Sequence, residues 1–282
     1  MKVRVREIEA KTILTPQKWG SLHPRYDYSL NPYAGCAFGC SYCYVPKFPN
    51  ARHEYFEWGT WVDVKMNAPE LIARERLKVF ASRIFFSSAT DPYQYLELKY
   101  RLSRRCLQEL LKYGPELVTM HTRSHLIRQD LDLLKAFGDT LQVGISITTD
   151  NETVRQEFEP SAPSLRRRLE LLRALRQAGI EVYASLSPLL PCDPDRLARL
   201  LKPFVGRVWA DRMRYPEINT RRHLLKKYSW FFEDRNYDSA LSTIESEFAN
   251  RSNWCRDALQ AHAAQAVPQP VQLQLNLAFN QS

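Results

Sequence analysis

Three cysteines near the start of the chain are the residues whose type and spacing point most directly to chemistry. Cys36, Cys40 and Cys43 lie in the stretch NPYAGCAFGCSYCY (31–44), with the spacing C-x3-C-x2-C. Thiolates grouped in this way bind zinc or an iron–sulfur cluster. Gly35 and Gly39 let the backbone around them fold tightly, because glycine reaches conformations closed to other residues. The sequence therefore predicts a metal-binding loop.

Three kinds of metal site compete for this loop. A structural zinc site needs four ligands, and His23 and His53 stand at no usual ligand spacing. An electron-transfer cluster also uses four cysteines, whereas Cys106, Cys192 and Cys255 are distant in sequence. A [4Fe-4S] cluster held by three cysteines instead leaves one iron with an open position for a substrate. Open positions distinguish catalytic metal sites from structural ones, so the sequence favours this third kind.

The composition is that of an ordinary globular protein. The 282 residues are 44% hydrophobic, 12% aromatic and 25% charged. No stretch approaches the roughly 18 apolar residues of a membrane helix, and the first residues, MKVRVREIEAKT, contain no apolar signal region. We therefore expect a cytoplasmic protein with no membrane partner. Thiols stay reduced there, so clustered cysteines indicate metal binding or catalysis.

The net charge of +9 is concentrated in one stretch. Residues 196–227 hold ten Lys or Arg and only two acidic residues, with Phe204, Trp209 and Tyr215 among them. Such a mixture is suited to contacting phosphates and stacking on bases, which makes nucleic acid a candidate partner. It is equally typical of a solvated basic helix face over buried aromatic residues. The sequence leaves both interpretations open.

The elements that must position these residues alternate between strands and helices. We expect strands at 81–89, 116–122, 141–149, 180–191 and 205–210, and helices at 100–114, 124–138, 164–179 and 194–201. The helix 164–179 is the clearest, because Leu165, Leu169 and Leu172 recur at helical spacing and Gly179 follows. The alternation predicts an α/β fold, a partial (β/α)6-type barrel of parallel strands, with a doubly wound open sheet as the alternative.

The chain divides into three expected parts. Residues 1–210 hold an N-terminal lead-in and the partial barrel, 211–260 a helical C-terminal extension, and 261–282 a flexible tail rich in Gln, Ala and Pro. In a β/α barrel, chemistry takes place at the carboxyl ends of the strands. The residues just after each expected strand are therefore the informative ones.

The cysteine loop, with an aromatic residue just before its last cysteine, resembles the signature of the radical S-adenosylmethionine (SAM) enzymes. The longer string NPYAGCAFGCSYCY resembles more narrowly the branch of the spore photoproduct lyases and "DNA repair photolyase" proteins. Further blocks follow in the order of that branch: SSATDPYQYLE (87–97), TRS (122–124), GISIT (144–148), FEPSAPSLRRRLELL (158–172) and SPLLP (187–191). The resemblance covers residues 7–210.

This resemblance implies two cofactors, a [4Fe-4S] cluster and SAM, and a partner that donates electrons, such as flavodoxin or ferredoxin. Cys36, Cys40 and Cys43 would be the iron ligands. One electron from the cluster would cleave SAM into methionine and a 5′-deoxyadenosyl radical, which abstracts hydrogen from a substrate. The chemistry belongs to the cofactor, and the protein positions it.

Other positions carry expected roles by the same resemblance. Tyr42 would pack against the adenine, and Tyr44 would line the active site and take part in hydrogen transfer. Ser88 and Thr90 would meet the methionine end of SAM, with Thr90 the favoured hydroxyl. Without the resemblance, Tyr42 would read as a core aromatic residue and Thr90 as a strand-end cap.

Arg123 stands where the lyases have a lysine that pairs with the methionine carboxylate, and arginine adds a bidentate fork. Ser146, at the end of an expected strand, would bind the ribose or the methionine moiety. Glu159 would either make a polar contact near the cofactor or support the start of the following helix. Without the resemblance, Arg123 would read as a surface charge and Ser146 as a cap.

One position departs from the lyase pattern. Ser88 aligns with the cysteine that donates hydrogen in the lyases, and a serine O–H bond is too strong for that role. The departure therefore leaves lyase-like and other radical chemistry both open, and it leaves open whether thymine-dimer DNA is the substrate. Cys192, just after an expected strand, would either donate hydrogen or fill space as a small buried residue.

The sequence thus favours a radical SAM enzyme whose substrate is unknown, with nucleic acid as the leading candidate. The alternative is a nucleic-acid-binding protein with a structural or redox-sensing iron–sulfur cluster. The P-loop and the GxSxG motif are both absent, which argues against NTPase and hydrolase chemistry. The sequence does not indicate the oligomeric state.

Overall fold

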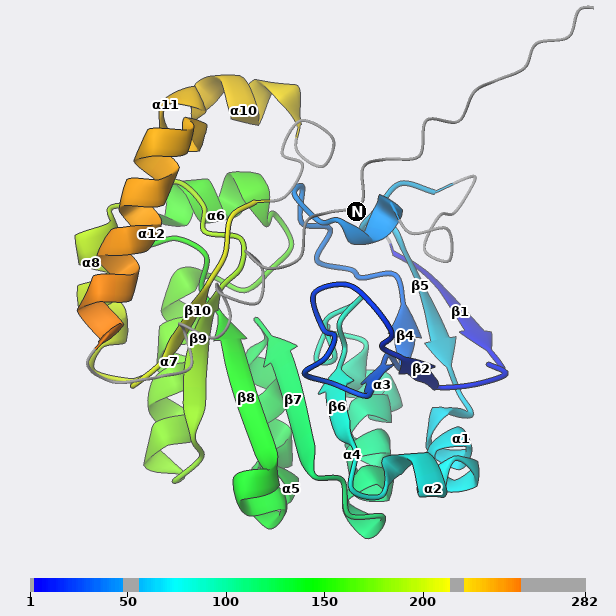
Figure 1. The fold of residues 1–282 in the computed structure, drawn as a ribbon. Helices are drawn as coiled ribbons and strands as arrows, with labels where there is room; N and C mark the ends of the chain where they lie inside the picture. Colours follow the sequence, from blue (N-terminus) through cyan, green and yellow to red (C-terminus); the bar gives the residue numbers. More distant parts are fainter. Residues whose placement is uncertain (1–2, 48–55, 214–220, 250–282) are drawn as a thin grey trace, which may run out of the picture.

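Six parallel strands form the centre of the molecule (Figure 1). The computed structural model describes residues 3–47, 56–213 and 221–249. The strands are β3 (Tyr28–Leu30), β6 (Arg83–Phe86), β7 (Leu117–Thr122), β8 (Leu141–Ser146), β9 (Val182–Leu186) and β10 (Val208–Ala210). They lie side by side in chain order, and β2 (Leu14–Pro16) adds an antiparallel edge next to β3. The strand order does not reverse as it does in a doubly wound sheet, so the predicted partial (β/α)6 barrel is confirmed.

Helices connect successive strands and lie on one side of the sheet (Figure 1). They are α3 (Glu97–Tyr100), α4 (Leu102–Lys112), η3 (His125–Asp130, a 3-10 helix), α5 (Leu131–Phe137), α6 (Glu152–Phe158), α7 (Leu165–Gln177) and α8 (Pro194–Leu201). A side-chain cap marks the start of four of them, η3, α6, α7 and α8. Ser164 accepts a hydrogen bond from the Arg167 amide, and Asp193 accepts one from the Arg196 amide, as N-cap residues do.

The two faces of the sheet differ in chemistry. Ile84, Val118 and Val143 belong to the buried apolar cluster that includes leucines of α4, α7 and α8. Side chains alternate along a strand, so neighbouring residues face the other way. On that inner face Phe85 and Tyr183 are buried but lie outside the apolar cluster. The helices therefore stabilise one face, and the other is left for the site.

A second, three-stranded sheet stands beside the barrel. It contains β1 (Arg4–Ile8), β5 (Trp61–Lys65) and β4 (Tyr33–Ala34), with β5 in the middle, and α1 (Ala68–Arg74) and α2 (Arg76–Val79) follow β5. The sequence analysis predicted neither this sheet nor β3. The reason is that β3 and β4 have three and two residues, too few to show a period. The cysteine loop begins directly after β4.

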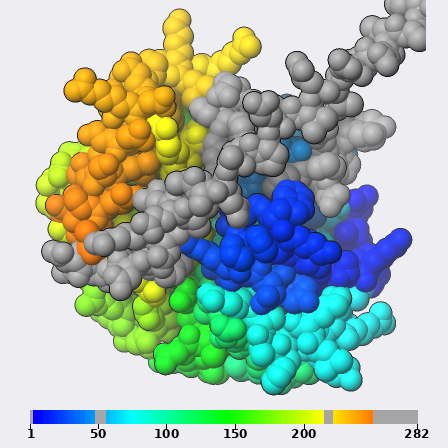
Figure 2. Space-filling view, viewed as in Figure 1, coloured from blue at the N-terminus to red at the C-terminus, as the bar shows by residue number. Residues whose placement is uncertain are grey.

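The N-terminal lead-in covers part of the inner face. Figure 2 shows the blue N-terminal segment in front of the sheet. The ring of Tyr26 meets Phe85 edge-on at 5.1 Å between centroids, and the Arg25 guanidinium lies 5.5 Å from the Trp209 ring. The lead-in thus packs on the inner face of the strands, whereas the cysteine loop is contacted by residues that follow the carboxyl ends of β6 and β7.

In the described part of the chain, three helices follow the barrel: α10 (Arg222–Lys227), α11 (Ser229–Phe232) and α12 (Asp234–Phe248). They fall in the region 211–260 where a helical extension was expected. Helix α12 packs against α8 (Figure 1), and Lys202 forms an ion pair with Glu247. The Tyr237 hydroxyl donates to the Leu189 carbonyl at 2.6 Å and accepts from the Met213 amide at 2.6 Å. The expected tail 261–282 lies outside the described residues.

No helix in the described part of the chain combines the length and the apolar character needed to cross a membrane.

Candidate functional site

The cysteine loop is held by the segment that follows β6. The Thr90 hydroxyl donates to the Gly35 carbonyl at 2.7 Å, and the Ala37 amide donates to Gln94 Oε1 at 2.9 Å. Gln94 Nε2 in turn donates to Thr90 Oγ1 at 3.1 Å. Thr90, which the sequence placed at the methionine end of SAM, thus contacts the loop backbone here. Together with Gln94 it fixes the path along which the cysteines are presented.

Glycine is required at the start of the loop. Gly35 has a φ of +81°, and a Cβ atom there would stand 2.5 Å from the Trp61 carbonyl oxygen. That contact is far inside van der Waals distance, and the atom it meets is backbone that cannot rotate away. The loop can therefore approach β5 this closely only without a side chain at position 35.

We expect Gly35→Ala to lower the free energy of unfolding well beyond the usual cost of alanine at positive φ. Gly179→Ala is the matched control, because Gly179 has a φ of +77° and no heavy atom within 4 Å of its added Cβ. The control should cost about 1 kcal/mol, and Gly35→Ala a further 1–3 kcal/mol or so from overpacking. Urea denaturation of the two variants measures the difference. Equal losses would mean that β5 moves aside at little cost.

The three cysteine side chains share one environment. Cys36 and Cys40 are buried, Cys43 is partly buried, and all three are free thiols. Burial raises the pKa of each thiol, to about 12 for Cys40, and the charges of the neighbouring cysteines act in the same direction for Cys40 and Cys43. The Arg123 guanidinium lowers the pKa of all three. A cation beside grouped thiols favours the thiolate form that binds metals.

The donor set fits an iron–sulfur cluster better than other metal groups. In the described residues no three or more His, Cys, Asp or Glu side chains are already gathered as a metal centre. The three thiols, however, come from one buried loop, and thiolates are the ligands of such clusters. Buried polar atoms without a partner also lie here, Ser41 Oγ and Arg123 Nε. Such atoms indicate a missing partner at this position.

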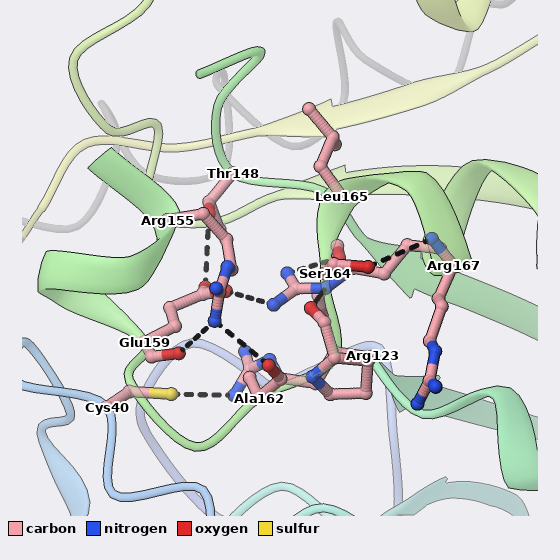
Figure 3. A network of polar contacts seen from close by, with 12 residues as sticks. Cys40, Arg123, Thr148, Arg155, Glu159, Ala162, Ser164, Leu165 and Arg167 are labelled. Carbon is pink, nitrogen blue, oxygen red and sulfur yellow. Dashed lines mark hydrogen bonds and ion pairs between the residues drawn. The ribbon is translucent and has the colours of Figure 1, made fainter. Parts of the chain in front are cut away.

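Arg123 connects the end of β7 to the cysteine loop. Its Nη1 atom donates to the Cys40 sulfur at 3.0 Å (Figure 3). Its backbone amide donates to Asp91 Oδ2 at 2.9 Å, and the Thr122 hydroxyl donates to the other carboxylate oxygen of Asp91 at 2.7 Å. Asp91 thus joins the turn after β7 to the segment after β6, and this fixes the position of the Arg123 backbone.

A buried carboxylate lies on the other side of the loop. Glu159 accepts hydrogen bonds from the Tyr42 hydroxyl, from the Thr148 hydroxyl at 3.1 Å and from Arg168 Nη2. Burial alone would raise the pKa of Glu159, but the guanidinium groups of Arg168 and Arg123 lower it to about 2. Glu159 is therefore ionised, and it links the cysteine loop to β8 and α7.

The backbone around Glu159 is fixed as well. Figure 3 shows Arg155 beside it, with Nη1 donating to the Glu159 carbonyl at 2.8 Å and to the Ala162 carbonyl at 2.9 Å. Of the two roles considered for Glu159, a polar contact at the site is the one made here, through Tyr42. Thr148 lies among the strand-end positions expected to matter but had no assigned role, and Arg168 was not predicted, since a buried arginine in a helix looks like its exposed neighbours.

The other expected cofactor contacts lie at the ends of β6 and β8. The Tyr44 hydroxyl donates to the Ser88 carbonyl at 2.8 Å, and Asn31 Nδ2 donates to Ser88 Oγ at 3.3 Å. Ser146 is buried at the end of β8, and its carbonyl accepts from Arg168 Nη1 at 3.0 Å. The structure thus brings Tyr44 and Ser88 together, and ties Ser146 to the buried network around Glu159.

Cys192 has other charged neighbours than the loop cysteines have. It follows β9, and the charged groups that act on its thiol are Asp150, Asp193 and Arg196. None of these belongs to the cysteine loop. Burial raises the pKa of the Cys192 thiol, so it stays protonated. These surroundings favour the interpretation of Cys192 as a small, partly buried residue.

The inner face of the barrel carries a histidine that the sequence analysis missed. His121 Nε2 is hydrogen-bonded to the Tyr183 hydroxyl, and its ring meets Phe85 and Trp209 edge-on at 5.0 and 5.6 Å between centroids. Burial, aided by the charge of Arg123, lowers the pKa of His121 to about 3, so the ring is neutral. Gly144 in the strand GISIT was the available signal, because glycine within a strand often marks a close approach. A Cβ atom there would stand 2.7 Å from His121.

The basic stretch 196–227 is largely balanced by acidic residues. Five of the nine basic side chains described in it form ion pairs: Arg196–Asp150, Lys202–Glu247, Arg207–Glu181, Arg212–Asp234 and Lys227–Glu157. Much of the positive charge seen in the sequence is therefore neutralised within the protein. The positive charge left for a partner is smaller than the composition indicates.

Comparisons with known proteins agree with this architecture. Residues 30–202 match the Radical SAM superfamily. An uncharacterised protein of Methanocaldococcus jannaschii is 30% identical over 250 residues, which cover 88% of this chain and 89% of that protein. An uncharacterised protein of Mycobacterium tuberculosis is 28% identical over 176 residues, 59% of this chain and 50% of its own length.

Solved structures of spore photoproduct lyase have a similar fold. The complex with dinucleoside spore photoproduct has a TM-score of 0.63 and 15% identity, and covers 88% of this chain and 80% of that one. A variant with bound AdoMet and dinucleoside spore photoproduct gives the same values. The resemblance drawn from the sequence motifs is thereby confirmed. The family match, the partial barrel and the cysteine loop agree, and the chain belongs to the radical SAM superfamily.

Proposed function

We propose that this chain uses a [4Fe-4S] cluster to cleave SAM reductively, generating a 5′-deoxyadenosyl radical that abstracts hydrogen from a substrate. Membership of the radical SAM superfamily supports an enzyme with radical chemistry. The observation that carries the specific proposal is the buried loop with three free thiols and an arginine donating to one of them. No fourth cysteine lies nearby in the sequence. Three thiolates without a fourth are the donor set expected for a cluster with one open iron.

The residues around the loop divide the work of binding. Cys36, Cys40 and Cys43 would hold the cluster, while Thr90 and Gln94 hold the loop in shape. Arg123 would pair with the methionine carboxylate through the Nε edge, which is buried and has no partner.

The adenosine end would lie on the other side of the loop. There Tyr42 is fixed by Glu159, and Ser146 stands at the end of β8. Ser88 would reach the methionine end. Tyr44, half exposed beside Ser88, would face the substrate.

The substrate remains to be identified, and we propose nucleic acid as the first class to test. Arg221, Arg222 and Lys226 are exposed, and within the described residues they have no acidic partner. These cations are suited to phosphate contacts. They also support the second candidate function, a nucleic-acid-binding protein with a structural or redox-sensing cluster. We further propose a cytoplasmic enzyme reduced by a flavodoxin or ferredoxin, since the five cysteines in the described residues are free thiols.

Formation of 5′-deoxyadenosine tests the proposal. The protein would be reconstituted anaerobically with iron and sulfide, reduced with dithionite, and mixed with SAM, and the products separated by chromatography. We expect methionine and 5′-deoxyadenosine in equal amounts, and faster formation when the substrate class is present. DNA, damaged DNA and RNA would be added in separate reactions. A full cluster that never yields 5′-deoxyadenosine with any of them would favour the binding-protein alternative.

A further inference from the structure

Arg123 is placed on the sulfur of a cluster ligand, a position that its expected pairing with the methionine carboxylate does not explain. The Nη1–Sγ distance to Cys40 is 3.0 Å, within hydrogen-bonding range for sulfur. Figure 3 shows the guanidinium group meeting the Cys40 side chain at the edge of the polar network. A contact of this kind lies just outside the metal ligands, where hydrogen bonds tune a bound metal.

The surroundings hold the guanidinium at this sulfur. The Arg123 backbone is fixed by the hydrogen bond to Asp91, and the charges of Asp91 and Glu159 both act on the side chain. Cys40 itself is buried, so the contact is shielded from water. Electrostatic interactions are stronger in such a setting than at a solvated surface. Since arginine does not lose its proton in proteins, the positive charge is permanent.

We infer that Arg123 is a positioning residue that sets the reduction potential of the cluster through its hydrogen bond to Cys40. The inference rests on the proposed function for the identity of the cluster. A cluster gains one negative charge when it is reduced, and a cation on a ligand sulfur stabilises that added charge. Hydrogen bonds to the sulfurs and local charge are established determinants of cluster potential. The Arg123 contact therefore raises the potential and makes the cluster easier to reduce.

A redox titration without SAM tests the inference directly. Wild-type, Arg123→Lys and Arg123→Gln proteins would be reconstituted, and the reduced cluster followed by electron paramagnetic resonance against solution potential. We expect the midpoint potential of Arg123→Gln to shift to more negative values. Arg123→Lys, which keeps the charge and loses the fork, should shift less in the same direction. The shift should be constant between pH 6.5 and 8.5, since arginine stays charged.

Arg128→Gln is the matched control. Arg128 is an exposed arginine five residues along the chain, with no ion pair within the described residues, and its loss should leave the potential unchanged. Equal potentials for wild type and Arg123→Gln at equal iron content would overturn the inference. So would an equal shift in Arg128→Gln, or failure of both Arg123 variants to take up iron, since a tuning residue is not needed for assembly.

Because no SAM is present, the titration gives its answer even if the protein proves unable to cleave SAM. Conversely, SAM cleavage with an unchanged potential in Arg123→Gln would leave the proposed function standing and remove this inference.

Discussion

Replacing Cys36, Cys40 or Cys43 singly by alanine is expected to abolish 5′-deoxyadenosine formation and to lower bound iron to the level of adventitious metal. The three thiols are the whole thiol supply of one buried loop, and a cluster held by two ligands would exchange with solvent. Iron and sulfide analysis after anaerobic reconstitution, with the ultraviolet–visible spectrum of the cluster, measures the loss of bound iron. Chromatography of the reaction with SAM measures the loss of 5′-deoxyadenosine formation.

Two other cysteines of the same chain provide controls. Cys106 is fully buried in the apolar core, and alanine there should cost about 1 kcal/mol of stability without loss of iron. Cys192→Ala should leave both iron and turnover at wild-type levels, because its neighbours are Asp150 and Asp193 rather than the loop. Loss of turnover in Cys192→Ala with a full cluster would restore its role as a hydrogen donor. A full cluster in Cys40→Ala would exclude the three-ligand site.

Glu159→Gln is expected to lower the free energy of unfolding by about 3–5 kcal/mol, the cost typical of a broken buried ion pair. The carboxylate is fully buried and faces Arg168, whose side chain is only 1% exposed, and the charge of Arg123 acts on it as well. An uncharged amide would leave these cations buried without their counter-charge. It would also present an NH₂ group where the Tyr42 and Thr148 hydroxyls now donate. Urea denaturation of the apoprotein gives the difference.

Ionised Glu159 also makes the protein lose stability as the pH falls. The pKa of Glu159 falls from its ordinary 4.5 to about 2 in the folded protein. The stabilisation that ionised Glu159 adds to the free energy of unfolding is therefore complete above pH 4.5 and is lost as the pH falls towards 2. Glu159→Gln should flatten this part of the stability curve. Glu170→Gln is the control, because Glu170 is half exposed and, among the residues described, pairs with Arg166 alone; its loss should cost about 0.5 kcal/mol or less.

The sequence was most informative where a pattern repeats or a motif is dense. The strands after residue 80 and the helix α7 were predicted because their apolar residues recur with the expected period. The strand β3 was not, since its three residues, YSL, show no period and gain their structure from pairing with β6. Tertiary pairing decides such short elements, and local sequence does not reveal it.

The residues of the site likewise fall into those that the sequence identified and those that only the structure shows. The cysteines stand in one contiguous motif, so their grouping was visible. Arg123 was assigned by its place in the block TRS, but its contact with Cys40 spans 83 positions and depends on how β7 meets the loop. Gln94 and Arg168 could not be assigned, because nothing in their neighbourhood distinguishes them from solvent-exposed residues. The sequence therefore identified the metal-binding residues and left the residues that orient them to the structure.

The order in which the parts of the site are synthesised follows from these long-range contacts. In the barrel sheet β6 pairs with β3, and each of β7, β8, β9 and β10 pairs with the strand before it, so each β/α unit can join the growing edge as it leaves the ribosome. The cysteine loop precedes β6 and all later barrel strands in the chain. The groups that fix it come later, at Gln94, Arg123 and Glu159. Between the synthesis of Cys43 and that of Glu159 the nascent chain therefore carries three thiols whose support is incomplete, so a cofactor can enter the finished site only after Glu159 has been made.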